Sequence, residues 1–65
     1  MRIAVNGEIA DVKSQTLADV LVELGHSGAK IATAVNEEFV PASKRADVVL
    51  EAGDRVEIVA PRQGG

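Results

Sequence analysis

Thr16 to Gly25 read TLADVLVELG, the one segment of the chain with a sustained helical pattern. The i, i+3, i+4, i+7 spacing of its apolar residues is typical of a helix with one buried side, and these residues are Leu17, Val20, Leu21 and Leu24. Thr16 and Asp19 have the N-cap and N3 spacing that satisfies backbone donors in a first turn. Gly25 follows at the C′ position, where glycine adopts a positive φ at little cost. The segment therefore predicts one capped amphipathic helix.

A β-hairpin is predicted before this helix. Residues 2–5 and 8–12 read as two short strands, although adjacent apolar residues blur the alternation of the second run. Between them lies Asn6-Gly7, a dipeptide that favours a type I′ turn because both positions of that turn need a positive φ. The two runs are therefore expected to pair with each other.

Four short apolar runs after the helix are read as further strands. They span residues 31–35, 39–40, 48–50 and 55–59. The last run alternates apolar and charged side chains, as strands with one buried face do. Residues 36–38 form a polar turn, and Pro41 ends the next run because proline cannot donate to a β-ladder. Residues 42–46 are a polar connection with room for one turn of 3₁₀ helix.

The order of these elements predicts the fold class. A single amphipathic helix that covers a four- to five-stranded sheet is an α+β arrangement with one hydrophobic core. The chain has 65 residues, and a domain of this size buries only about 60% of its unfolded surface. We expect one domain over residues 1–61 and a flexible C-terminal tail at residues 62–65.

Charge and composition argue against several classes of function. The formal net charge is −3, cysteine is absent and there is one histidine. Nucleic-acid binders usually show a basic patch and aromatic stacking surfaces. No apolar stretch approaches the ~20 residues of a membrane span, and we expect no signal peptide, because the polar pair Asn6-Gly7 interrupts the first apolar run. We therefore expect a cytoplasmic protein, monomeric when free, with no nucleic-acid or membrane partner and no metal site.

The C-terminal sequence Arg62-Gln63-Gly64-Gly65 is the strongest functional signal. Glycine has no Cβ, so two successive glycines let the backbone enter a narrow channel. A free α-carboxylate at Gly65 is anionic at neutral pH, and the extended tail reaches about 13–14 Å. Such an arm suits delivery of a carboxylate into the active site of another protein. The alternative is that chain ends are often glycine-rich simply because they tolerate change.

Four segments together resemble the ThiS family, the small sulfur carriers of thiamine (thiazole) biosynthesis with a ubiquitin-like β-grasp fold. They are residues 5–8 (VNGE), 34–41 (AVNEEFVP), 53–58 (GDRVEI) and 63–65 (QGG). The resemblance extends over essentially the whole chain. It implies a mixed β-grasp sheet in which the first and last strands are parallel neighbours. Arg62 departs from the family pattern, in which an apolar residue is common, so the way in which partners grip the arm stays open.

The chemistry that this resemblance implies falls on Gly65. In the family, an E1-like adenylyltransferase (ThiF-like) adenylates the terminal glycine with ATP and Mg²⁺. Sulfur that a donor such as a cysteine desulfurase draws from cysteine then replaces AMP and gives a thiocarboxylate, the 1-thioglycine form. Thiazole synthase (ThiG-like) takes this sulfur into the thiazole ring. Gly64 keeps the arm thin, and the chain itself is implied to be a carrier with no bound cofactor.

The remaining candidate residues and functions stay as alternatives. Arg62 and Gln63 are candidate partner contacts. Phe39 either packs in the core or on a sheet face, or belongs to an exposed apolar patch that docks partners. No catalytic triad or metal-ligand spacing is present that would make the chain an enzyme. The other functions are a sulfur carrier for the molybdopterin or cysteine pathway, a ubiquitin-like protein modifier joined to lysines, and a passive β-grasp interaction module.

Overall fold

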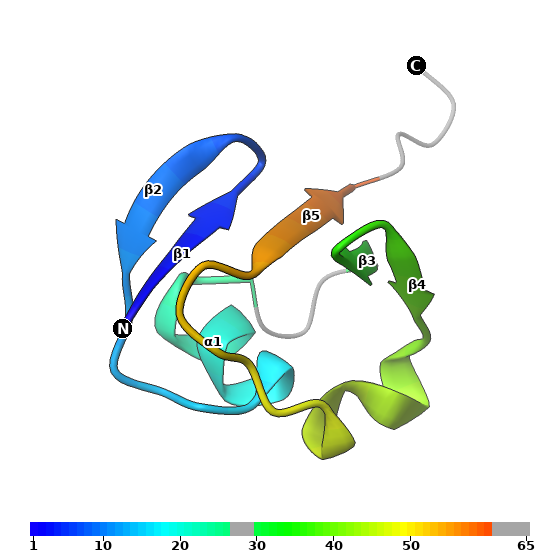
Figure 1. Ribbon diagram of the computed structural model, residues 1–65. Coiled ribbons are helices and arrows are strands. Elements are labelled where there is room, and N and C mark those ends of the chain that lie inside the picture. Colours follow the sequence, from blue (N-terminus) through cyan, green and yellow to red (C-terminus); the bar gives the residue numbers. More distant parts are fainter. Residues whose placement is uncertain (27–29, 61–65) are drawn as a thin grey trace.

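Five strands and two helical segments make up the part of the chain that the computed structural model describes, residues 1–26 and 30–60. The α-helix α1 spans Leu17–Glu23, and the 3₁₀ helix η1 spans Ala42–Asp47. The strands are β1 (Arg2–Val5), β2 (Glu8–Asp11), β3 (Ala32–Val35), β4 (Glu38–Val40) and β5 (Arg55–Val59). Figure 1 shows them coloured along the chain.

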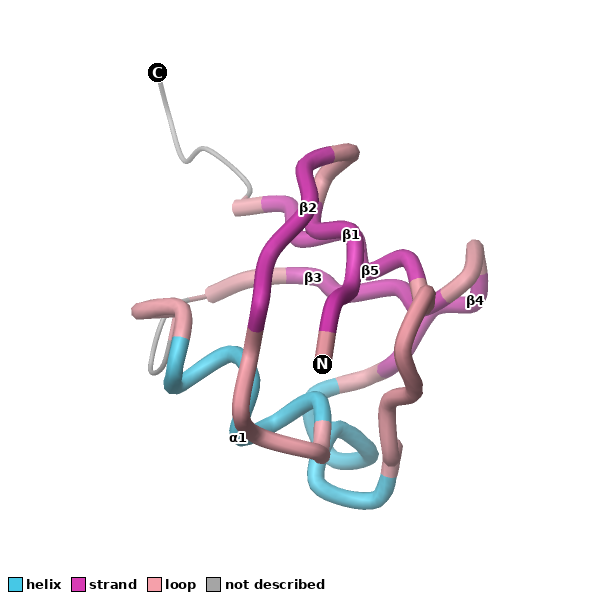
Figure 2. Tube along the Cα trace, turned by 60° about the vertical axis from the view of Figure 1, so that its left-hand side comes forward, coloured by secondary structure: helices cyan, strands magenta, loops and turns pink. Residues whose placement is uncertain are grey.

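The strands form one mixed sheet in the order β2-β1-β5-β3-β4 (Figure 1). β1 and β5, the first and last strands, are parallel neighbours, and the other strand pairs are antiparallel. Both helical segments lie on the same side of the strands in Figure 2. The predicted ubiquitin-like β-grasp fold is therefore confirmed, with five strands at the upper end of the expected range.

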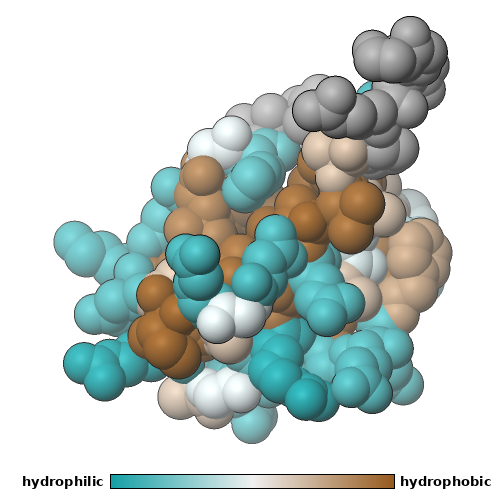
Figure 3. All heavy atoms as spheres, turned by 90° about the horizontal axis from the view of Figure 1, so that it is seen from above, coloured by the Kyte–Doolittle hydropathy of each residue, from teal (hydrophilic) through white to brown (hydrophobic). Residues whose placement is uncertain are grey.

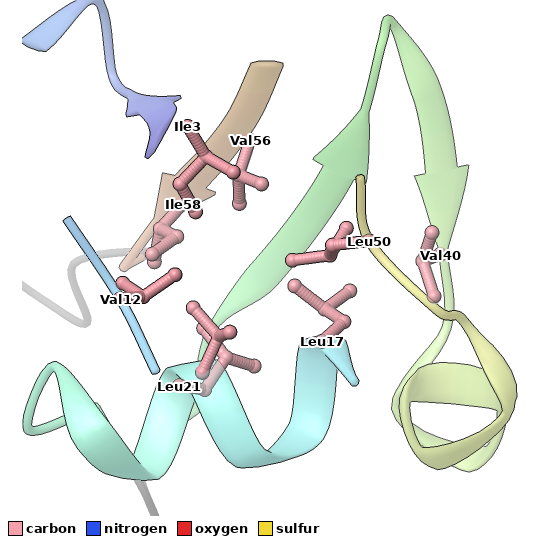
Figure 4. Close-up of a cluster of buried hydrophobic side chains, with 9 residues drawn as sticks. Ile3, Val12, Leu17, Leu21, Val40, Leu50, Val56 and Ile58 are labelled. Atoms are coloured by element: carbon pink, nitrogen blue, oxygen red, sulfur yellow. The ribbon is translucent and has the colours of Figure 1, made fainter. Parts of the chain in front are cut away.

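One hydrophobic core fills the space between α1 and the sheet. Three residues of the predicted helical stripe, Leu17, Val20 and Leu21, are buried, and Leu24 is half-buried. Figure 4 shows side chains from the helix and the strands pointing toward one another. The buried cluster consists of Ile3, Val12, Leu17, Val20, Leu21, Val40, Leu50, Val56 and Ile58. Each such aliphatic side chain contributes about 1.5–3 kcal/mol on full burial, so this cluster is the main source of stability.

Both predicted helix caps are present. The Thr16 hydroxyl accepts a hydrogen bond from the Asp19 N–H at 3.2 Å. At the other end Gly25 has a φ of +86°, and its N–H donates to the Val22 carbonyl at 3.0 Å. The His26 N–H donates to the Leu21 carbonyl at 2.8 Å. These two bonds are the Schellman arrangement that closes a helix at glycine.

The hairpin turn also agrees with its prediction. Asn6 and Gly7 have φ values of +51° and +84°, as a type I′ turn requires. The turn between β3 and β4 has the same character, because Asn36 and Glu37 have φ values of +50° and +73°. Glu38, which the sequence placed in this turn, is instead the first residue of β4.

The predicted strand at residues 48–50 is wrong. Val49 forms only an isolated antiparallel bridge with Thr16. The Leu50 N–H donates to the Gln15 carbonyl at 2.8 Å, and the Leu17 N–H donates to the Val48 carbonyl at 2.9 Å. The backbone of this segment therefore pairs with the entry to α1 and not with a strand of the sheet, while Leu50 contributes to the core.

Thr33 is the one buried polar residue among those described, and it joins η1 to the sheet. Its hydroxyl donates to the Val40 carbonyl at 2.9 Å and accepts from Arg45 Nε at 3.1 Å. Arg45 Nη2 also donates to the Ile31 carbonyl at 2.7 Å. Every buried side-chain nitrogen and oxygen in residues 1–26 and 30–60 has a hydrogen-bond partner, as a well-formed interior requires.

Candidate functional site

The predicted reactive arm, Arg62 to Gly65, lies outside the described residues, so its assignments remain predictions. The strand that leads to it is β5, which ends at Val59. This strand is the middle of the sheet and pairs with β1 on one edge and with β3 on the other. Val56 and Ile58 are only 1% and 7% exposed. The strand that precedes the arm in the sequence is therefore held on both edges and on its core-facing side.

Phe39 lies on the outer face of the sheet and not in the core. It is 69% exposed and sits opposite Ala34, which sits in turn opposite Glu57 of β5. Val59, 59% exposed, is opposite Ala32 on the same face. Because Ile58 and Thr33 alternate with these residues and are buried, the four apolar residues face away from α1.

We call these four residues, Ala32, Ala34, Phe39 and Val59, the outer patch. It lies beside the end of β5. Figure 3 shows brown hydrophobic atoms among teal hydrophilic ones on the face seen from above. Exposed apolar groups that gather in this way are typical of protein-binding surfaces. Phe39 is thus exposed and not packed in the core, and a docking role for the patch stays a prediction.

The charged residues near β5 make contacts that stabilise turns, and these contacts do not assemble a binding site. Asp54 accepts from the Glu51 N–H at 2.8 Å and from Asn36 Nδ2 at 3.1 Å. Arg55 lies 3.9 Å from the Glu37 carboxylate, with both side chains mostly exposed. An exposed pair of this kind contributes little to stability.

Asn6 has a contact that sequence reasoning missed. Its Oδ1 accepts from the Ile58 N–H at 2.8 Å, and its Nδ2 donates to the Ile58 carbonyl at 3.1 Å. The sequence indicated only a turn at this position. Local spacing cannot find the contact, because its partner lies 52 residues away along the chain. The only signal available was the side chain itself, since a carboxamide both donates and accepts.

A shallow pocket of about 250 Å³ lies between α1 and η1, away from the outer patch. Its lining is Ala18, Leu21, Val22, His26, Ala42, Arg45 and Ala46. Small-molecule sites combine an apolar lining with several convergent polar groups. Here the Arg45 side chain is already bonded to Thr33 and Ile31, so this pocket is a weak candidate for a ligand.

Within residues 1–26 and 30–60, no three or more His, Asp and Glu side chains are grouped so as to hold a metal ion.

The Glu23 carboxylate has its pKa lowered from the ordinary 4.5, chiefly because it accepts from the Lys13 and Ser14 backbone N–H groups. These bonds join α1 to the loop that precedes it, so the role of Glu23 is structural.

None of the helices in the described ranges has both the length and the apolar character to cross a membrane.

All the comparisons with known proteins point to proteins of thiamine biosynthesis. The model of the ThiS family matches residues 3–65. The sulfur carrier protein ThiS of Thermus thermophilus is 40% identical over 60 residues, which cover 92% of this chain and 94% of that protein. A thiazole synthase of Paramagnetospirillum magneticum is 41% identical over 66 residues. That alignment includes 100% of this chain but only 20% of the much longer synthase.

Two solved structures share the fold. A crystal structure of a thiamine biosynthesis protein (ThiS) from Geobacter metallireducens superposes with a TM-score of 0.84 at 23% identity and covers 100% of both chains. A solution NMR structure of a thiamine biosynthesis protein from the same organism has a TM-score of 0.80 at 22% identity. It covers 100% of this chain and 88% of that one.

Proposed function

The chain belongs to the ThiS family, and from this premise we propose that it is a sulfur carrier whose Gly65 is adenylated, converted to a thiocarboxylate and used to supply sulfur for the thiazole of thiamine. The observation on which the proposal rests is the extent of the family match. It continues to residue 65 and so includes Gly64 and Gly65, the residues that would carry the chemistry.

The proposed chemistry needs little from the carrier itself. A carboxylate oxygen of Gly65 attacks the α-phosphorus of ATP, and pyrophosphate leaves. The mixed anhydride is a good electrophile, and the terminal sulfur of a persulfide on the donor attacks its carbonyl and displaces AMP. A thiol then reduces the resulting acyl disulfide and releases the thiocarboxylate. Glycine leaves that carbonyl without a neighbouring side chain, and the partner enzyme supplies Mg²⁺ and the acid–base groups. The carrier is therefore a co-substrate, acted on by an E1-like adenylyltransferase and a sulfur donor such as a cysteine desulfurase.

The carrier must also dock on its partners. The outer patch offers an apolar surface beside the strand that leads to the arm, so one partner can hold both at once. A thiazole synthase is the proposed acceptor of the sulfur. The Paramagnetospirillum thiazole synthase supports this choice, because a segment similar to the whole of this chain is part of that polypeptide.

A mass measurement tests the proposed function. The chain is incubated with an E1-like adenylyltransferase, ATP, Mg²⁺, a cysteine desulfurase and cysteine, and its intact mass is recorded. Replacement of one carboxyl oxygen by sulfur adds about 16 Da, the atomic-mass difference expected for this acyl substitution. A variant without Gly65 is the matched control and should keep its mass. An unchanged mass of the full chain, where a known carrier gains sulfur in the same mixture, contradicts the proposal.

A further inference from the structure

The parallel ladder between β1 and β5 stops before β5 does. The Asn6 N–H donates to the Val56 carbonyl at 2.9 Å. In a regular parallel ladder the next two bonds would join the Ile58 N–H to the Asn6 carbonyl and the N–H of residue 8 to the Ile58 carbonyl. The chain has turned away by then, because Asn6 and Gly7 have positive φ values and Glu8 belongs to β2.

The Asn6 carboxamide takes the place of both missing bonds. Its oxygen stands in for the backbone carbonyl of Asn6, and its nitrogen stands in for the backbone N–H of residue 8. A carboxamide has the same donor and acceptor groups as a peptide unit, so it continues the ladder by one step. Without it, both main-chain groups of Ile58 would lose their partner at a partly buried position.

This step lies at the root of the arm. Ile58 precedes Val59, the last residue of β5. Beyond the end of β1, the strand pairing of β5 comes from β3 alone within the described part of the chain, through Thr33 opposite Ile58 and Ala32 opposite Val59. Asn6 is therefore the second support of β5 at the point where the strand leads to the tail.

We propose that Asn6 is a positioning residue for the C-terminal arm, a role that rests on the function proposed above. The Gly65 carboxylate must meet the α-phosphorus of ATP in the partner's active site. A change in the position of β5 at Ile58 moves the point from which the arm begins, relative to the surface of the domain that docks on the partner. Misplacement of a reacting group by about 1 Å is enough to cost up to 100-fold in rate. Asn6 fixes the origin of the arm without touching the reacting atoms.

Asn36 provides a matched comparison at the opposite end of β5. It has a φ of +50°, close to the +51° of Asn6. Its Oδ1 accepts from the Arg55 N–H at 3.0 Å, in place of its own backbone carbonyl, and its N–H donates to the Arg55 carbonyl at 2.7 Å. In both asparagines Oδ1 accepts from a backbone N–H of β5. Asn36 holds the start of the strand, with its Nδ2 bonded to Asp54, whereas both polar atoms of the Asn6 carboxamide hold the end of the strand.

The test compares Asn6→Gly with Asn36→Gly in the full chain. Glycine accepts a positive φ, so both turns are retained while each carboxamide contact is lost. The rate of adenylation by the E1-like enzyme is measured by the ATP–pyrophosphate exchange assay. The temperature is one at which circular dichroism shows that both variants are folded. Hydrogen exchange of the Ile58 amide is measured by NMR on the same samples.

We expect Asn6→Gly to lower kcat roughly 10- to 100-fold and to leave the carrier's KM within about threefold, because docking through the outer patch persists. The Ile58 amide should exchange faster in this variant. Asn36→Gly should keep kcat within about twofold of the unsubstituted chain. If Asn6→Gly does not fold, Asn6→Asp takes its place, since it keeps the oxygen that accepts from Ile58 and removes the donor.

Equal losses of kcat in the Asn6 and Asn36 variants would show that Asn6 has only a structural role and would overturn the proposal. So would a loss of kcat in Asn6→Gly with unchanged exchange at Ile58, because Asn6 would then act by touching the partner directly. Failure of the unsubstituted chain to be adenylated is a separate result. It contradicts the proposed function itself, whatever the variants do.

Discussion

At the scale of single residues, two turn residues of this protein also bond through their side chains to backbone groups that are distant in the sequence. The sequence predicts turns at Asn6 and Asn36, because asparagine and glycine tolerate a positive φ. It does not predict that each carboxamide also bonds to β5, since those partners lie 52 and 19 residues away. Turn propensity is local, whereas these contacts exist only after the sheet has formed.

Glu23 gives a prediction about pH at the same scale. Its folded-state pKa is lowered from 4.5, mainly by the Lys13 and Ser14 N–H groups, so the contact stabilises the fold above the unfolded-state pKa. This contribution is lost as the pH falls through the lowered folded-state value. Glu23→Gln should therefore be less stable than the unsubstituted chain at pH 7, and the difference should shrink toward pH 3.

Urea unfolding at pH 7, 5 and 3 measures this difference for Glu23→Gln. Glu8→Gln, at an exposed carboxylate of β2, is the control and should follow the unsubstituted chain at each pH. A stability difference for Glu23→Gln that stays constant across the three pH values would rule out the carboxylate contacts as its cause.

At the scale of elements, the local sequence pattern predicts some helices and strands correctly, whereas others are decided by tertiary contacts. α1 follows from its sequence because its stripe, N-cap and terminal glycine all indicate the same helix. The conformation of residues 48–50 could not be predicted from the sequence, because an apolar run of this length is compatible with either a strand or a buried connection. Phe39 shows the same limit, since period-2 spacing assigns a residue to a face but does not say which face α1 covers.

The outer patch gives a prediction about binding. Phe39→Ala removes an exposed side chain that lies on the sheet face opposite α1, so it should change the melting temperature little. It should weaken binding to the adenylyltransferase at least roughly tenfold if Phe39 is an anchor of the interface. Isothermal titration calorimetry with the enzyme measures the Kd.

Val49→Ala is the matched control for this prediction. Val49 is 66% exposed, close to the 69% of Phe39, but it lies beside the entry to α1. Its Kd should equal that of the unsubstituted chain. Equal Kd values for the Phe39 and Val49 variants would remove the outer patch from the docking surface.

At the scale of the whole molecule, the parallel pairing of β1 with β5 joins the two ends of the sequence. The first strand and the last strand lie side by side at the centre of the sheet. No local pattern predicts this neighbour relation, and in the sequence analysis it came only from the resemblance to the ThiS family. The arm chemistry has the same status, because it rests on family membership and on the last two residues.

Because β5 is central, its backbone should open only when the whole sheet does. Val56 lies between Val5 of β1 and Val35 of β3 and is 1% exposed. Its amide should therefore exchange with solvent at nearly the free energy of global unfolding, whereas amides of the edge strand β4 exchange sooner. NMR-detected hydrogen exchange compared with the unfolding free energy from urea checks this. An exchange free energy for Val56 far below the global value would contradict it.

The parallel arrangement of β1 and β5 also has a mechanical consequence. A partner that tugs on the C-terminal end while it holds the body of the domain applies force along the axis of β5. The bonds to β1 and β3 lie across that axis, so they resist sliding as a group and do not open one after another like a zip. A carrier whose C-terminal residues follow the central strand of its sheet is therefore expected to resist unfolding by force applied at that end.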